Sequence, residues 1–215
     1  MSIVIALDGP AGSGKSTISK LVAENLGIEY IDTGAMYRSV AYYCVNNGID
    51  YLNEEMVEAN LDYVDIDFIN GDVYLNGEDV ESKVHTEEIG IVVPKVAAYK
   101  EVRSKITDIC RELAKGKSLI MDGRDIGIHV LKDEATLKIY LTASAEERAN
   151  RRLKEFKNVS FEDVLNEINE RDYQDMHREI SPLKKADDAI EIDSTDMSIE
   201  SVVDFIERMA YGKDN

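Results

Sequence analysis

The amino-acid sequence predicts an α/β fold in which a buried parallel strand leads directly into a phosphate-binding loop. The residues Ile3 to Leu7 form a short apolar, β-branched run that is typical of a buried parallel strand. The next segment, Gly9 to Thr17, matches the pattern G-x-x-x-x-G-K-[ST] without a mismatch. From Ser16 to Leu26 apolar side chains recur at helical spacing, and Gly27 follows where a C-terminal cap is expected. The motif therefore lies between a strand and a helix, the context that a phosphate-binding loop needs.

The residues of this loop suit a nucleoside triphosphate. Glycines let the backbone turn tightly around an anion, and the helix N-terminus adds a partial positive charge. Lys15 can reach the outer phosphates, and Ser16 offers its hydroxyl to Mg²⁺. A glycine-rich turn with a surface lysine is the alternative, but chance produces this pattern in only roughly 1% of chains of this length. We expect the whole loop to bind ATP: Gly9, Pro10, Ala11, Gly12, Ser13, Gly14, Lys15, Ser16 and Thr17.

Length and composition limit the class of protein. A chain of 215 residues suffices for one α/β domain with inserted subdomains. The net charge of −18 argues against nucleic acid or an anionic membrane as a partner, because both would be repelled. Cys44 and Cys110 have no C-x-x-C spacing and indicate neither a disulfide framework nor a zinc site. The N-terminal apolar run ends at Asp8, too early for a signal peptide, so we expect a cytoplasmic protein.

The window from Asp50 to Gly90 has a different character, with thirteen acidic residues and one lysine. Two runs alternate apolar and polar residues, Tyr63 to Asn70 and Val73 to Leu75. The first ends in the pair Asn70-Gly71 and the second is followed by Asn76-Gly77, and such pairs are typical of hairpin turns. We expect a small antiparallel insertion outside the main sheet. Its charge is most simply a solvated face, and an acidic partner-binding surface is the less favoured alternative.

Polar residues follow two further predicted strands. The run Ile28 to Ile31 ends at Asp32-Thr33-Gly34, and a helix from Ala35 to about Asn47 carries Arg38. Because ligands gather at the carboxyl ends of strands in open α/β sheets, we expect Thr33 and Arg38 on the same rim as the phosphate-binding loop. A plain N-cap for Thr33 and a solvated helix face for Arg38 are the alternatives.

The segment from Thr86 to Ala114 is predicted to be mostly helical, interrupted or restarted near Pro94, and it carries Arg103. The strand Ser118 to Asp122 comes next. An apolar strand that ends in aspartate can hold Mg²⁺ beside a phosphate-binding loop, directly or through water. Since aspartate is also a common turn former, the metal role remains one of two interpretations.

Two charged helices and one more strand–helix pair complete the chain. In the helix from Ser144 to Phe156, three arginines fall at i, i+3 and i+4. In the helix from Ser160 to about Met176, a set of two arginines and one aspartate falls at i, i+4 and i+7. Pairing with nearby glutamates on a surface is the alternative interpretation. The two sets are Arg148, Arg151 and Arg152, and Arg171, Asp175 and Arg178. Strands are predicted at Thr136 to Leu141 and Ala189 to Ile192, and an amphipathic helix at Ser198 to Met209.

The arginines indicate which kind of group accepts the phosphoryl group. A hydroxyl acceptor usually calls for a carboxylate base, whereas a phosphate monoester is largely a dianion at neutral pH. Bringing that dianion against ATP is opposed by charge, and guanidinium groups neutralise both partners while holding them in line. The sequence therefore favours a phosphate acceptor over a hydroxyl acceptor. A nucleotide-dependent switch is a third possibility, but no guanine-reading N-K-x-D occurs.

A set of motifs spanning nearly the whole chain resembles the family of bacterial cytidylate kinases. They are Gly9 to Thr17, Asp32 to Arg38, Val96-Ala97-Ala98 with Arg103, Asp122-Gly123-Arg124-Asp125, Glu147-Arg148-Ala149 with Arg151-Arg152, Glu170-Arg171-Asp172, Ser181-Pro182-Leu183 and Asp193-Ser194-Thr195. The resemblance implies a nucleoside-monophosphate kinase fold with a parallel five-stranded sheet flanked by helices. It also implies a core of residues 1–34, 116–147 and 180–215, an inserted α+β subdomain for the nucleoside monophosphate at 35–115, and a helical lid at 148–179. The implied reaction transfers the ATP γ-phosphoryl group to CMP or dCMP with Mg²⁺, in a protein that we expect to be a monomer.

The same resemblance implies a role for each matching residue. The residues implied to be catalytic are Lys15, Arg124, Arg148 and Arg178, those that contact ATP are Arg151 and Arg152, and those that hold the metal are Ser16 and Asp122. The acceptor phosphate is implied to be bound by Thr33, Arg38 and Arg124, with Arg178 close by as a further substrate-binding residue. Its sugar is implied to be bound by Arg171 and Asp175, and its base by Arg103 and Asp125. Cytosine offers two acceptors and an amine donor, which suits one Arg and one Asp. Pro94 departs from the pattern, because it stands where many family members have a base-binding serine and it can donate no hydrogen bond.

Overall fold

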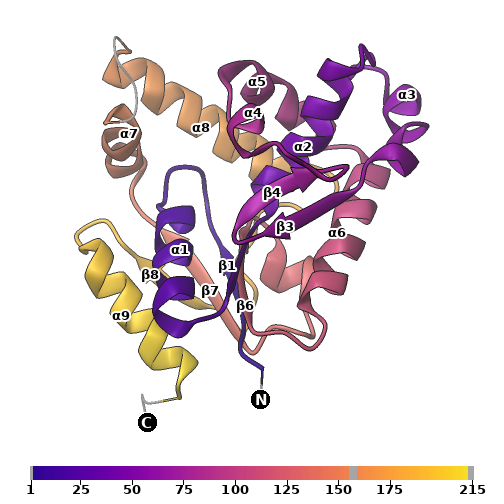
Figure 1. The fold of residues 1–215 in the computed structure, drawn as a ribbon. Helices are drawn as coiled ribbons and strands as arrows, with labels where there is room; N and C mark the ends of the chain where they lie inside the picture. Colours follow the sequence, from indigo (N-terminus) through magenta and orange to yellow (C-terminus); the bar gives the residue numbers. More distant parts are fainter. Residues whose placement is uncertain (1, 155–158, 213–215) are drawn as a thin grey trace. The chain divides into compact units, whose positions relative to one another are not determined.

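The computed structural model describes residues 2–154 and 159–212, and the chain divides into two compact units that are described separately below (Figure 1). The first, which we call the loop unit, comprises Met1–Tyr30 and Gly116–Asn215. The second, the insertion unit, comprises Ile31–Lys115. No helix in the described part of the chain combines the length and the apolar character needed to cross a membrane.

The main sheet confirms the predicted parallel five-stranded core. Its order is β2-β6-β1-β7-β8, with β1 in the centre. The strands are β1 (Val4–Asp8), β2 (Glu29–Asp32), β6 (Leu119–Gly123), β7 (Leu137–Thr142) and β8 (Ile190–Asp193). In register, Asp8 lies opposite Gly123 of β6 and Tyr140 of β7. The phosphate-binding loop and the segment after β6 therefore leave the sheet side by side at its carboxyl edge.

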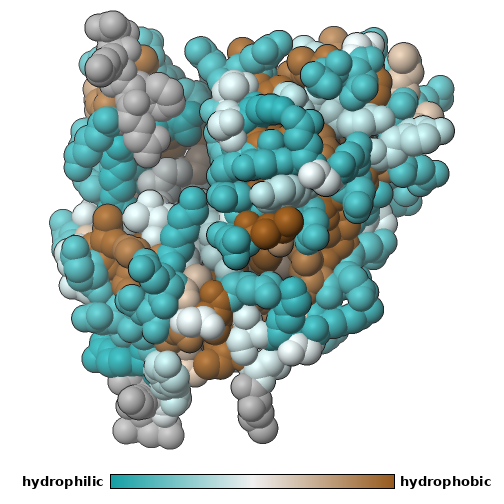
Figure 2. All heavy atoms as spheres, viewed as in Figure 1, coloured by the Kyte–Doolittle hydropathy of each residue, from teal (hydrophilic) through white to brown (hydrophobic). Residues whose placement is uncertain are grey.

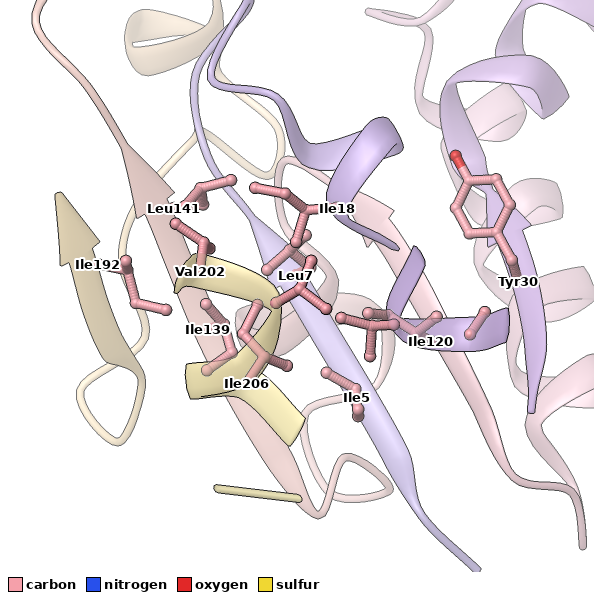
Figure 3. Packing of buried hydrophobic residues seen from close by; sticks show 13 residues of the cluster. Ile5, Leu7, Ile18, Tyr30, Ile120, Ile139, Leu141, Ile192, Val202 and Ile206 are labelled. Carbon is pink, nitrogen blue, oxygen red and sulfur yellow. The ribbon is translucent and has the colours of Figure 1, made fainter. Parts of the chain in front are cut away.

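Helices α1 (Lys15–Leu26) and α9 (Ile199–Ala210) pack against the loop unit's main hydrophobic core. Figure 3 shows Ile5 and Leu7 of β1 and Ile139 of β7 lying with Val202 and Ile206 of α9. Full burial of such a side chain contributes roughly 1.5–3 kcal/mol. Gly27 caps α1 in the left-handed conformation at φ 64°, as predicted, so the helix ends sharply before β2.

The helices α7 (Ala145–Leu153) and α8 (Phe161–His177) form a second, smaller core through Ala149, Val164 and Ile168. Their N-caps are Ser144 and Ser160, which bond the backbone N–H groups of the first turn. The predicted end of the first of these helices, Phe156, lies outside the described residues. A short π-helix, η2 (Ile126–Val130), follows β6.

The insertion unit contains the predicted antiparallel insertion as a separate three-stranded sheet of order β3-β4-β5. Both predicted turns are present, with positive φ at Asn70 and Gly71 and at Asn76 and Gly77. The strands are β3 (Ile66–Ile69), β4 (Asp72–Leu75) and β5 (Glu78–Asp79), and the helices are α2 (Thr33–Asn46), α3 (Glu54–Glu58), η1 (Leu61–Tyr63), α4 (Glu81–Val84), α5 (Glu87–Val96) and α6 (Lys100–Ala114). On the face shown in Figure 2, hydrophilic side chains cover most of the surface.

The predicted helical break near Pro94 is present, but it lies after Val96 and not at the proline itself. Pro94 is inside α5, and the next helix begins only at Lys100 after Tyr99. A proline removes one N–H and crowds the carbonyl of Gly90, yet here it falls in the last turn, where few further helical bonds depend on it. The proline therefore lies within α5 without dividing it.

Candidate functional site

The phosphate-binding loop is held by close backbone packing and by its own lysine. Lys15 is buried, and its Nζ donates to the Pro10 carbonyl at 2.7 Å and to Ser13 Oγ at 3.3 Å. Gly9 has φ 155°, and a Cβ there would lie 2.0 Å from the Leu141 carbonyl oxygen. The loop can follow this path only with glycine at position 9, because the obstructing atom belongs to a strand backbone.

Ser16 and Asp122, the two predicted metal-binding residues, are brought together. Ser16 Oγ donates to Asp122 Oδ2 at 2.8 Å, and the Tyr30 hydroxyl donates to Asp122 Oδ1 at 3.5 Å. A hydroxyl and a carboxylate are the oxygen ligands that Mg²⁺ prefers, with water and phosphate completing its octahedron. The pair therefore fits this ion, although the described residues contain no group of three His, Cys, Asp or Glu side chains that could hold a metal.

Arginines and aspartates meet where β6 ends. Arg124 Nε donates to Asp175 Oδ2 at 2.9 Å, while Arg178 contacts Asp125 Oδ1 at 3.3 Å and Asp175 Oδ1 at 3.8 Å. Burial alone would raise the pKa of Asp175, but Arg124, Arg178 and Arg171 together lower it. Four predicted site residues from two distant parts of the chain therefore form one charged cluster. Arg178 is the C-cap of α8 rather than part of its helical stripe, which corrects the predicted spacing.

Lys15 lies within electrostatic reach of this charged cluster. Burial lowers the pKa of Lys15, and the positive charge of Arg124 lowers it further, against the opposing effect of Asp122, Asp8 and Asp175. An anion bound between Lys15 and Arg124 would relieve the repulsion between the two cations. The carboxyl edge of the sheet is therefore electrostatically suited to a highly charged ligand.

Arg148 connects the helix α7 to the phosphate-binding loop. Its Nε donates to the Ala143 carbonyl at 2.9 Å, and its Nη1 donates to the Ala11 carbonyl at 3.0 Å and to Asp172 Oδ2. The other oxygen of Asp172 accepts the Ala11 N–H at 3.3 Å. Asp172 belongs to the sequence motif Glu170-Arg171-Asp172, but no site role was predicted for it, because an acid on a charged helix gives no signal of this contact.

The other two arginines of α7 diverge. Arg151 donates to the Ser13 carbonyl at 3.2 Å and to the Ser194 carbonyl at 2.6 Å, so it reaches the phosphate-binding loop. Arg152 donates to Glu167 Oε1 at 2.8 Å on α8, which is the surface pairing given above as the alternative. Arg151 also pairs with Glu147 at 2.9 Å, so the alternative interpretation holds for it in part. The predicted shared face is thus divided: Arg148 and Arg151 bond the phosphate-binding loop, and Arg152 pairs with a glutamate of α8.

Three predicted ligands belong to the insertion unit. Thr33 is buried and is the first residue of α2. The N-cap of this helix is Asp32, whose side chain accepts the Ala35 N–H at 3.1 Å, so the N-cap alternative for Thr33 is wrong. Arg38 donates to the Val84 carbonyl at 3.4 Å. Arg103 is buried and donates to the Ala97 carbonyl at 3.1 Å, with its guanidinium 5.3 Å from the centre of a tyrosine ring. The insertion unit thus buries a threonine and an arginine that most proteins keep at the surface.

Asp8 is the last residue of β1, and the sequence predicted no functional role for it. It is 5% exposed, and its carboxylate accepts the N–H groups of Ile126 at 2.8 Å and Gly127 at 2.7 Å. Burial raises its pKa to about 6. An aspartate that closes an otherwise apolar strand was the only sequence signal available.

Comparisons with known proteins agree over almost the full length. The family model described as cytidylate kinase matches residues 5–211. A cytidylate kinase from Thermosipho melanesiensis is 49% identical, with 97% of each chain covered, and one from Clostridioides difficile is 47% identical, with 94% of this chain and 95% of the relative covered. Among solved structures, an uncharacterized protein from Eubacterium ventriosum has a TM-score of 0.56 at 14% identity, with 99% of each chain covered. At that identity the likeness concerns the fold alone.

Proposed function

The chain belongs to the cytidylate kinase family, and we propose on this premise that it transfers the γ-phosphoryl group of ATP to CMP or dCMP, giving ADP and CDP or dCDP. The observation that supports the reaction best is that the loop carrying Lys15 and the segment carrying Arg124 follow neighbouring strands at the same edge of the sheet, where Arg124 is held by Asp175 at 2.9 Å. One cation belongs to the loop that receives ATP, and the other to a cluster that suits the phosphate of the acceptor.

In this proposal, catalysis depends on electrostatic positioning without a dedicated base. The acceptor phosphate has a second pKa near 6 and is already ionised at neutral pH. Lys15, Arg124, Arg148 and Arg178 neutralise charge on the two phosphate groups and on the transferred group between them. Their own contacts, such as Arg124 with Asp175, hold the guanidinium planes before substrate arrives.

The acceptor is recognised through three groups of side chains. Thr33, Arg38, Arg124 and Arg178 bind its phosphate; Arg171 and Asp175 bind its sugar; and Arg103 and Asp125 bind cytosine. The contact of Arg178 with Asp125 at 3.3 Å supports this assignment, because it orients the carboxylate that would accept from the cytosine amine. On the donor side, the loop from Gly9 to Thr17 binds the phosphates of ATP together with Arg151 and Arg152.

Ser16 and Asp122 are the proposed residues for Mg²⁺. Their 2.8 Å contact places a hydroxyl beside a carboxylate next to the phosphate-binding loop. When bound, the ion would neutralise charge on the β- and γ-phosphates. Lys15 supplies charge on the same phosphates from the protein side.

We further propose that residues 35–115 form the part that binds the nucleoside monophosphate and that residues 148–179 form the lid. The contact between Arg148 and the Ala11 carbonyl supports the lid assignment, because it joins α7 to the ATP loop. The net charge of −18 favours a small-molecule substrate over nucleic acid or an anionic membrane. We propose a monomer acting in the cytoplasm.

The test is a coupled measurement of ADP release with CMP, dCMP, UMP, AMP and shikimate as acceptors in the presence of ATP and MgCl₂. We expect rapid turnover with CMP and dCMP, slower turnover with UMP, and none above background with AMP or shikimate. Turnover with shikimate alone would assign a hydroxyl acceptor instead. Background rates with both cytidine nucleotides would contradict the proposal.

A further inference from the structure

Asp8 occupies a junction between the two halves of the proposed active site. It is the last residue of β1 and directly precedes Gly9, the first residue of the ATP loop. In the parallel register it lies opposite Gly123, two residues before Asp125. A side chain at this point can affect the segment after β6 without touching a substrate.

The carboxylate of Asp8 fixes the turn that follows Asp125. Its Oδ1 accepts the Ile126 N–H at 2.8 Å and its Oδ2 accepts the Gly127 N–H at 2.7 Å. The carbonyl of Asp125 accepts the N–H of His129 at 2.9 Å, so the far side of the same turn is closed by the backbone. Two charge-assisted bonds and one backbone bond therefore fix the backbone around Asp125, whose carboxylate contacts Arg178.

The turn has little room to shift. A Cβ added at Gly127 would lie 3.3 Å from the Lys138 side chain and 3.4 Å from Asp8 Oδ2. Asp8 itself is buried, so water does not compete for its two hydrogen bonds. A small change at Asp8 would therefore be transmitted to Asp125 rather than absorbed by solvent.

The charged groups around Asp8 come from three elements. Asp125 raises its pKa further and Lys15 lowers it, while the Asp8 carboxylate contributes to a raised pKa of Tyr140 on β7, for which burial is the main cause. The Lys138 side chain approaches from β7 at Gly127, with its Nζ paired to Asp188 at 2.8 Å. Asp8 thus lies within electrostatic reach of both the ATP loop and Asp125.

We propose that Asp8 is a positioning residue that fixes Asp125 relative to the ATP loop and so contributes to the selection of cytosine over uracil. This inference rests on the proposed function, in which Asp125 accepts a hydrogen bond from the cytosine amine. Uracil presents an oxygen at the same place, so discrimination depends on where the carboxylate points. Asp8 acts through the Ile126 and Gly127 amides and touches neither substrate.

The experiment compares wild type with Asp8→Asn. The amide can accept only one of the two N–H groups, because its nitrogen faces the other as a donor. We expect the KM for CMP to rise about tenfold and the preference for CMP over UMP to fall about tenfold, with the KM for ATP changed by less than about twofold. Equal increases in the KM for CMP and for ATP, or an unchanged CMP preference, would overturn the inference.

A matched control is Asp193→Asn. Asp193 also ends a parallel strand, β8, but its carboxylate accepts the Thr195 N–H at 2.9 Å instead of the amides that follow Asp125. We expect this variant to retain the wild-type KM for CMP and CMP preference. Loss of preference in the control to the same degree would mean that any strand-end aspartate has this effect, and the inference would fail.

A second variant keeps the test decisive if Asp8→Asn does not fold. Gly127→Ala retains Asp8 but adds a Cβ 3.3 Å from the Lys138 side chain and 3.4 Å from Asp8 Oδ2, at the residue whose N–H this oxygen accepts. We expect it to lower the CMP preference in the same direction. Thermal unfolding of each variant identifies those that fold. If wild type itself does not phosphorylate CMP, the proposed function fails; if wild type does and both variants keep its preference, only the inference about Asp8 fails.

Discussion

Arg124 and Asp175 form a largely buried ion pair, with Nε and Oδ2 2.9 Å apart and side chains only 21% and 19% exposed. Burial opposes the charge on Arg124, but Asp175 and then Asp122 raise its pKa, so the guanidinium stays protonated. The pair joins the segment after β6 to α8. Nη1 of Arg124 also donates to the Gly123 carbonyl at 3.3 Å, so two of the three guanidinium nitrogens are held by the protein.

This arrangement predicts a large effect of Arg124→Lys. An ammonium cannot bond Asp175 and a phosphate with the planar geometry of a guanidinium, so charge is conserved while geometry is lost. We expect kcat with CMP to fall on the order of 10²-fold. Steady-state kinetics at saturating ATP and CMP measure this change. A kcat within threefold of wild type would exclude Arg124 from the reacting groups.

Asp125→Asn and Lys15→Ala are predicted to differ in their selectivity. Replacing Asp125 with an amide removes a base-reading acceptor, and we expect the ratio of kcat/KM for CMP over UMP to fall roughly tenfold to a hundredfold. Lys15→Ala removes a cation from the ATP side, so turnover with every acceptor should fall together. Parallel assays with both acceptors measure the two ratios. Equal losses for CMP and UMP in Asp125→Asn would show that the base is read elsewhere.

Asp8 is predicted to make stability depend on pH. Its pKa is raised from 3.8 to about 6 in the folded protein, so the folded state binds its proton more tightly than the unfolded state. The stabilisation is complete below about pH 4 and is lost as the pH rises to about 6, a difference of up to about 3 kcal/mol.

Urea unfolding of wild type and Asp8→Asn at pH 4.5 and pH 7.5 tests this dependence. Asparagine does not titrate, so the stability of wild type relative to the variant should decline between these two pH values. Asp175 and the other acids contribute equally to both proteins and cancel in the difference. A relative stability that is constant or rises with pH would contradict a raised pKa for Asp8.

Gly9→Ala is predicted to destabilise the protein far more than Gly27→Ala. A Cβ at position 9 would lie 2.0 Å from the Leu141 carbonyl oxygen, whereas a Cβ at position 27 meets nothing within 4 Å. We expect a loss of at least about 3 kcal/mol at Gly9 and of about 1 kcal/mol at Gly27, where only the left-handed φ is unfavourable. Unfolding in urea provides both values, and similar losses would mean that the strand backbone at Leu141 yields easily.

Local patterns predicted the elements that local sequence determines. The first strand, its loop and α1 were predicted correctly because apolar spacing and a capping glycine lie within a few residues of one another. The two hairpin turns were predicted for the same reason, from their Asn-Gly pairs. The short helices α3 and α4 were missed, because four or five residues are too few to show a helical period.

The contacts around the site could not be predicted from spacing. Asp8 bonds the Gly127 N–H across 119 positions of the chain, and Asp172 bonds the Ala11 N–H across 161. Asp8 closes an apolar strand and Asp172 belongs to the motif Glu170-Arg171-Asp172, but neither feature indicates a partner so far away in the chain. Arg152 shows that a regular helical spacing does not predict a partner: it lies on the same helix as Arg148 and Arg151, and its guanidinium pairs with Glu167.

The two bonds to Ala11 couple the attachment of α7 and α8 to the binding of an anion by the phosphate-binding loop. Arg148 of α7 holds the Ala11 carbonyl, and Asp172 of α8 holds its N–H. An anion that takes this N–H must displace the Asp172 carboxylate, so it weakens the attachment of α8. By reciprocity, whatever strengthens that attachment weakens anion binding by the same factor, which makes Asp172 an internal competitor for the loop.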